Sequence, residues 1–373
     1  MAFLYARAMR RAIALVIATG LLLPLLAAPS RPAPRKMEIA PGVFVFMTAP
    51  YGAVGLDGNS VVVVSRDGVL VFDSNGTPTA AAAVLSEVRA MTRAPVRYVV
   101  HSHWHWDHWY GAEIYRKAFP DVEIVAHEKT RAMMAGPALE FNRPGLERQL
   151  PDYIRSVERR ITAGEAATSP AADLPALRDA LDDARYFLEQ KRTVQHTLPT
   201  RTFSDRLDIT LGEHDIQILN FGRAVTPGDA LMFLPKLRVI AAGDLIVNPV
   251  TFALSSYPTE WIRALEKMDA LDAGVIVPGH GEPLRDETLL HATLDVFRVL
   301  VTEGRTARDR GLDADQTREA LEPALQPLMV KITGDAPAYN AAFRTQLVDW
   351  FLHRVFDELA GPLTDDIAPI PPR

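Results

Sequence analysis

The chain of 373 residues contains no cysteine. This absence excludes disulfides, iron–sulfur clusters, thiol nucleophiles and zinc sites built on thiolates. The chain also lacks a basic block. It has 40 lysines and arginines and 46 aspartates and glutamates, so its formal charge is −6. This net negative charge argues against nucleic acid as the main partner. Proline (28) and glycine (22) stay below the level of a low-complexity chain, so a folded protein is expected.

The N-terminal residues indicate export. Three arginines within residues 7–11 precede an apolar run over residues 12–28, a pattern typical of a secretory signal peptide. The run is near the lower length limit for a membrane span, so an uncleaved N-terminal anchor is the alternative. We expect a secreted or periplasmic protein with a signal peptide (1–28), a proline-rich linker (29–41), and no membrane span after cleavage.

The mature chain alternates short β-runs with helices. We expect a domain over residues 42–285 with a helical insertion at about 143–195, where leucine, alanine and phenylalanine recur every three or four residues. We expect this insertion to consist of two long helical segments with a break around residues 164–170. A C-terminal helical region (286–360) and a flexible tail (361–373) follow. Two successive β-rich halves with helices indicate an internally doubled α/β sandwich.

Residues 101–108 read His-Ser-His-Trp-His-Trp-Asp-His and directly follow an apolar strand. Imidazole and carboxylate are the zinc ligands that remain in a chain without thiols. On an extended or loop backbone, His103 and His105 point to one side and can bind one ion. Asp107 and His108 lie beyond a turn and can reach a second ion. The alternative is a solvated histidine-rich loop.

Two later segments supply further candidate ligands. Asp244 follows a strand in Ala242-Gly243-Asp244, so its carboxylate emerges at a strand end. Alone, it would read as a helix cap or a turn residue. His280 stands between two glycines in Val277-Pro278-Gly279-His280-Gly281, where glycine lets the backbone turn sharply and bring an imidazole inward.

These motifs together resemble the metallo-β-lactamase superfamily. The resemblance covers Gly42–Pro283 and rests on the His-x-His-x-Asp-His element, the Thr226-Pro227-Gly228-Asp229 turn, the Gly243-Asp244 pair and the Pro278-Gly279-His280-Gly281 turn. Asn59-Ser60 and Phe72-Asp73 are similar to the family's opening strands. The resemblance implies a four-layer αββα sandwich with metals at one edge, between the sheets.

The resemblance also implies a ligand set for one or two Zn²⁺ ions. It assigns His103 and His105 to the first metal, it assigns Asp107, His108 and His280 to the second, and it makes Asp244 the bridge between them. Asp107 would in addition orient the metal-activated water, which makes it the candidate catalytic residue.

One position departs from the family pattern. The family usually has a histidine, the third ligand of the first metal, immediately before the Thr-Pro-Gly turn, and this chain has Val225 there. Valine cannot bind a metal, so we expect the second site to hold its ion more tightly. His101 or Asp229 could compensate, although we expect His101 rather to hydrogen-bond nearby.

We therefore expect an exported zinc-dependent hydrolase acting on an amide, ester or thioester bond of a small molecule. Histidine at position 105, where oxygen-reducing diiron relatives carry glutamate, argues against that branch. Sulfur dioxygenase relatives would need the histidine that Val225 replaces. The alternative is a catalytically impaired metal- or ligand-binding relative.

Three features leave more than one interpretation open. The aromatic residues of the ligand loop either pack in the core or form a wall for an apolar substrate; they are Trp104, Trp106, Trp109 and Tyr110. The helical insertion is either a lid or a surface element. The C-terminal helices cover the sandwich, bind a partner or support a dimer, and the oligomeric state does not follow from the sequence.

Overall fold

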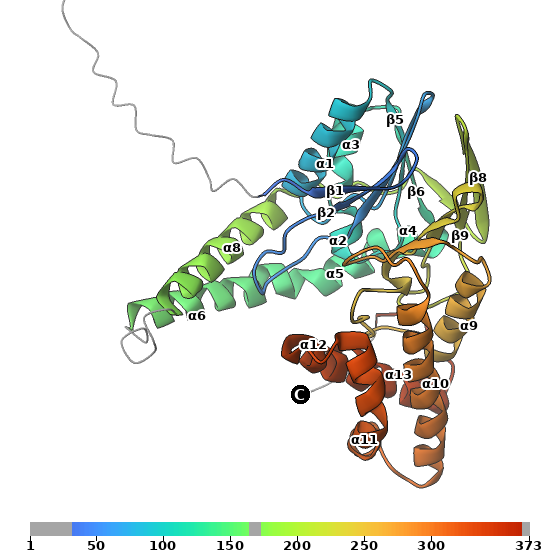
Figure 1. Cartoon of the computed structure of the whole chain (residues 1–373). Helices are drawn as coiled ribbons and strands as arrows, with labels where there is room; N and C mark the ends of the chain where they lie inside the picture. Colours follow the sequence, from blue (N-terminus) through green and yellow to red (C-terminus); the bar gives the residue numbers. More distant parts are fainter. Residues whose placement is uncertain (1–31, 164–172, 368–373) are drawn as a thin grey trace, which may run out of the picture. The chain divides into compact units, whose positions relative to one another are not determined.

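Two β-sheets packed face to face form the centre of the protein (Figure 1). The structure is a computed structural model that describes residues 32–163 and 173–367. The expected signal peptide (1–28) and the end of the tail (368–373) lie outside the described residues. The expected break within the helical insertion (164–170) lies outside them as well.

The larger sheet has seven strands in the order of the chain. They are β1 (Arg35–Ala40), β2 (Val43–Met47), β3 (Ser60–Ser65), β4 (Gly68–Phe72), β5 (Val96–Val100), β6 (Glu123–His127) and β7 (Arg201–Phe203). Strands β1 to β4 pair antiparallel, and β4 to β7 pair parallel.

The smaller sheet has five strands in the order β12-β11-β10-β9-β8. They are β8 (Arg206–Leu211), β9 (His214–Leu219), β10 (Leu231–Leu234), β11 (Val239–Ala241) and β12 (Val275–Val277). All pairs are antiparallel except β11 with β12, which are parallel.

The alternation of side chains along the strands produces the layers. In β3, Val61 and Val63 face the core between the sheets, where they join Ile216 and Ile218 of β9. Val62, between them, belongs to the cluster on the opposite face, which helices α1 (Pro78–Met91) and α3 (Ala112–Ala118) cover. Helices α9 (Pro258–Asp269) and α10 (Thr288–Asp309) cover the outer face of the smaller sheet. This is the predicted four-layer αββα sandwich.

A helical segment interrupts the chain between β6 and β7. It contains α4 (Glu128–Met134), α5 (Pro137–Pro144), the π-helical turn η1 (Gly145–Gln149), α6 (Leu150–Thr162) and α8 (Asp173–Thr193). Helices α6 and α8 lie side by side (Figure 1) and pack through Ile154, Val157, Leu181 and Ala184. The helical conformation begins earlier than the expected boundary near residue 143.

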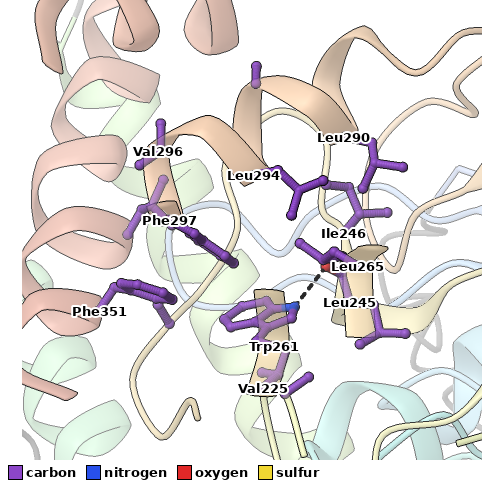
Figure 2. Close-up of a cluster of buried hydrophobic side chains, with 14 of the residues drawn as sticks. Val225, Leu245, Ile246, Trp261, Leu265, Leu290, Leu294, Val296, Phe297 and Phe351 are labelled. Atoms are coloured by element: carbon purple, nitrogen blue, oxygen red, sulfur yellow. Dashed lines mark hydrogen bonds between the residues drawn. The ribbon is translucent and has the colours of Figure 1, made fainter. Parts of the chain in front are cut away.

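The C-terminal helices complete the cluster on the smaller sheet. They are α11 (Ala314–Thr333), α12 (Pro337–Ala342), the π-helical segment η4 (Phe343–Asp349) and α13 (Trp350–Ala360). Figure 2 shows Trp261 of α9 near Phe297 of α10 and Phe351 of α13, with Val225 on its other side. The indole Nε1 of Trp261 donates a hydrogen bond of 3.2 Å to the carbonyl oxygen of Leu245, so its polar atom is satisfied.

Both chain segments expected to be irregular hold defined contacts where the structure describes them. Residues 35–40 of the expected linker form β1, which pairs with β2. In the expected tail, the carbonyl oxygen of Leu363 accepts a hydrogen bond of 2.8 Å from Arg223, and that of Thr364 accepts one of 2.9 Å from Tyr257. Among the helices of the described ranges, none is both long and apolar enough to cross a membrane.

The substitution Trp261→Ala should lower the free energy of unfolding by about 3–5 kcal/mol, because it leaves a cavity in a fully buried cluster. Val330→Ala, at an exposed position of α11, should change it by less than about 1 kcal/mol. Urea unfolding followed by circular dichroism measures both. Similar losses for the two variants would contradict the assignment of this cluster as the core.

Candidate metal centre

The candidate ligands gather at one edge of the sandwich because parallel strands end there. The loop after β5 carries His103 and His105 and leads into the short helix α2 (Trp106–Trp109). In the smaller sheet, Asp244 lies in a tight turn after β11, and His280 follows β12. The carboxyl ends of parallel strands share an edge of a sheet, so side chains distant in sequence come together.

The six predicted ligands form two groups that meet at Asp244. The first group is His103, His105 and Asp244, and the second is Asp107, His108 and His280. Within each group, the ligand atoms lie within 4.8 Å of one another, so each group could hold a metal ion.

The two carboxylate oxygens of Asp244 face different groups. Oδ2 lies 3.6 Å from Nε2 of His103, whereas Oδ1 lies 3.3 Å from Nε2 of His108 and 3.6 Å from Nε2 of His280. This arrangement is the one that a bridging carboxylate requires.

Asp73, directly after β4, orients two of the imidazoles. Its Oδ2 accepts hydrogen bonds from Nδ1 of His108 (2.8 Å) and from the hydroxyl of Ser102 (2.8 Å). Because Ser102 Oγ donates to Asp73, it accepts from Nδ1 of His103 at 2.9 Å. In their neutral, metal-binding form both imidazoles therefore carry their proton on Nδ1 and present the lone pair of Nε2 to the site. The sequence analysis gave Asp73 no role in the site; the available indication was a carboxylate directly after a buried strand.

The turn that carries His280 is held by a residue of the first half of the chain. The side-chain amide of Asn59 donates to the carbonyl oxygens of Pro278 (2.9 Å) and Gly281 (2.8 Å). Its backbone N–H donates to Gly279 at 2.7 Å. A Cβ on Gly279 would lie 1.9 Å from Oδ1 of Asp244, so only glycine allows the turn to pass this close to the ligand.

The donor set fits zinc or a similar divalent ion. Nε2 of His103, Nε2 of His108 and Oδ1 of Asp244 are buried and have no hydrogen-bond partner within the described ranges. Buried polar atoms normally have partners, so atoms that converge without them suit a metal ion. Zinc binds imidazole nitrogen and carboxylate oxygen, and these are the ligands available in a protein without thiols.

Electrostatics within the site favour the ligand forms of His103, His105, Asp107 and Asp244. Burial lowers the pKa of His103 and His105, which keeps both imidazoles neutral. Burial alone would raise the pKa of Asp107 and Asp244, but the neighbouring imidazoles, above all His108, hold both below the usual range. Neutral imidazoles and ionised carboxylates are the forms that bind metal. The carboxylates of Asp107 and Asp244 outweigh burial and raise the pKa of His108 and His280, so these two imidazoles must release a proton when a metal ion binds.

Neither candidate substitute for the missing histidine belongs to these groups. Val225 is fully buried in the cluster of Figure 2, beside Trp261. Oδ2 of Asp229 accepts a hydrogen bond of 2.8 Å from the backbone of Thr226, and burial raises its pKa to about 7. His101 is fully buried, and burial lowers its pKa to about 3. Its expected role as a nearby hydrogen-bonding residue stays a prediction.

The site opens into a cavity of about 500 Å³ with mainly apolar walls. His105, Asp107, Asp244 and His280 line it. The walls come from several segments, and they include Leu56, Trp106, Phe141, Val250, Phe252, Tyr339 and Ala342. The C-terminal helices therefore contribute to the site through α12. Of the ligand-loop aromatics, Trp104 and Trp109 are buried in the core, and Trp106 faces the cavity.

Comparisons with known proteins were made for the sequence and for the fold. The family model of the metallo-beta-lactamase superfamily matches residues 53–280. The curated "Linear primary-alkylsulfatase" of Pseudomonas sp. (strain ATCC 19151) is 24% identical over 335 residues, which are 83% of this chain. The chain spans 58% of the length of that relative.

Solved structures of metallo-β-lactamases share the fold. The enzyme from Pontibacter korlensis is 16% identical with a TM-score of 0.50, and the match covers 71% of this chain and 99% of that one. FIM-1 from Pseudomonas aeruginosa, in its mono-zinc form, is 15% identical with a TM-score of 0.50 and coverages of 73% and 98%. The family match covers more than half of the chain and includes all six candidate ligands. The chain belongs to the metallo-β-lactamase superfamily.

Proposed function

We propose that the protein is a zinc-dependent hydrolase of ester bonds, with the sulfate ester of an apolar alcohol as the first candidate substrate. The observation that carries this proposal is the pair of ligand groups joined by Asp244 at the base of an apolar-walled cavity. Among the amide, ester and thioester bonds that the sequence left open, the alkylsulfatase relative favours an ester.

His103, His105 and Asp244 would hold one ion, and Asp107, His108 and His280 the other. When bound, such ions supply Lewis acidity toward the scissile group and lower the pKa of water. Asp107 lines the cavity, so its carboxylate can accept a hydrogen bond from the attacking water and orient it. The apolar walls exclude bulk water and accommodate the carbon chain of the substrate.

The competing function is metal or ligand binding without turnover, which the loss of a histidine at Val225 suggested. An observation against this alternative is that the first ligand group keeps three metal-ligand side chains, His103, His105 and Asp244, without a contribution from position 225. A Val225→His variant is a poor test, because it would bury an imidazole in the apolar cluster beside Trp261. We also propose that the protein is exported, on the sequence of residues 1–28 alone.

Metal analysis by mass spectrometry should find two zinc ions per chain in the purified protein. The His280→Ala variant should bind one ion fewer, and its kcat/KM should fall by more than about a hundredfold. Mutating a residue that only hydrogen-bonds to a metal ligand already costs about 10–100-fold in metal affinity or activity, and loss of the ligand itself should cost more. His353→Ala, in α13 and outside every candidate ligand group of the described residues, is the control and should change neither. One ion in the unaltered protein would indicate mononuclear catalysis, and none would overturn the proposal.

Asp73→Asn should weaken zinc binding by about tenfold to a hundredfold, because both oxygens of Asp73 accept hydrogen bonds and an amide has only one acceptor oxygen. Its NH2 group would face either the backbone N–H of Ser102 or the donors at Oδ2. Competition with a chromophoric chelator measures the affinity of the folded protein. Asp208→Asn, at an exposed position of β8, is the matched control and should leave the affinity unchanged. Equal affinities for the two variants would show that Asp73 does not orient the ligands.

A substrate panel separates the bond classes. Dodecyl sulfate should be hydrolysed with a higher kcat/KM than p-nitrophenyl butyrate or a β-lactam, because the cavity walls are apolar and the curated relative is an alkylsulfatase. Sulfate release is measured by ion chromatography, with His280→Ala as the background control. A metal-loaded protein that hydrolyses none of the three would support the binding-only alternative.

A further inference from the structure

Lys191 of α8 has a buried ammonium group without a hydrogen-bond acceptor among the described residues. Its Nζ lies 3.6 Å from the centroid of the Trp106 ring and 4.0 Å from that of Tyr110. Aromatic faces attract a cation, but they accept none of its three protons as a carboxylate would. Burial lowers the pKa of Lys191 well below its usual range, which reflects the cost of a charge in this environment.

The two carboxylates that interact electrostatically with Lys191, those of Asp57 and Asp107, are bound by other groups. Oδ1 of Asp57 accepts from the backbone of Gly76 at 2.9 Å, and its Oδ2 accepts from the hydroxyl of Tyr51 at 2.7 Å. Asp107 belongs to the second ligand group, and its Oδ2 lies 3.0 Å from Nε2 of His280. The amine of Lys191 is therefore buried without a hydrogen-bond acceptor among the described residues.

Lys191 lines a second cavity, of about 310 Å³, which is within the range of small-molecule sites. The cavity lies among α5, η1, α6, α8 and the turn at residues 53–54, and its apolar wall includes Val54, Leu146, Leu150 and Phe187. It shares Trp106 and Asn142 with the metal cavity, so these two side chains belong to both walls. Among the described residues that line it, none is acidic.

We propose that this second cavity binds an amphiphilic anion, with the apolar chain against Val54, Leu146 and Phe187 and the carboxylate or sulfonate paired with Lys191. An apolar chain suits the lining by the hydrophobic effect. An anionic end group would supply the acceptor that Lys191 lacks, and charge-assisted hydrogen bonds are the stronger kind. This site goes beyond the hydrolase function and does not depend on it, because binding can be measured without turnover.

The test is a calorimetric titration of the metal-loaded protein with octanoate and with octan-1-ol, its uncharged counterpart. Lys191→Met keeps the length of the side chain and removes the charge. It should weaken octanoate binding by about tenfold to a hundredfold, the usual contribution of hydrogen bonds to charged groups, and change octan-1-ol binding by less than about threefold. Leu146→Trp fills the cavity without altering Lys191 and should weaken the binding of both compounds.

Lys236→Met, at an exposed lysine paired with Asp215, is the matched control and should leave both affinities unchanged. Unchanged octanoate affinity in both Lys191→Met and Leu146→Trp would overturn the proposal. In that case the role of Lys191 would be structural, limited to packing α8 against the rings of Trp106 and Tyr110. Loss of octanoate binding in His280→Ala, with normal binding in Leu146→Trp, would place the anion on the metal centre and would overturn it too.

Discussion

The carboxylate of Asp73 is the point on which the metal centre depends. It accepts three hydrogen bonds, from the backbone and hydroxyl of Ser102 and from the ring of His108. Its backbone has a positive φ of 62°, a conformation that aspartate adopts more readily than most residues. This turn directs the side chain inward at the end of β4, where it sets the protonation pattern of one imidazole directly and of another through Ser102.

The second half of the site is positioned by contacts between the two halves of the chain. Asn59 and His280 are far apart in sequence, yet the amide of Asn59 holds both sides of the turn that carries His280. Nearby, the backbone N–H of Gly279 donates to Gly243 at 2.7 Å, which fixes the turn of Asp244. The ligands therefore keep their places only while the two sheets remain packed on each other.

The features of the fold and the site that depend on local sequence patterns could be predicted from the sequence. The β-runs, the helical insertion and the six ligand candidates follow from alternation, periodicity and compact motifs, and the sandwich follows from the resemblance. The partners of those ligands could not be predicted in the same way, because Asp73 and Asn59 act through contacts between distant segments. The chemistry of valine excludes Val225 as a ligand from the sequence alone, but only the packed structure places it in the cluster with Trp261.

Most of the apolar cavity wall comes from other parts of the chain than the metal ligands. The ligands lie on loops between strands, whereas Phe141, Phe252 and Tyr339 extend from α5, a long loop and α12. Reactivity and selectivity are thus encoded separately. An insertion or a shift in the outer helices can change which molecules enter without altering the charges at the reacting centre. A scaffold divided in this way can acquire new substrates in evolution while its chemistry stays constant.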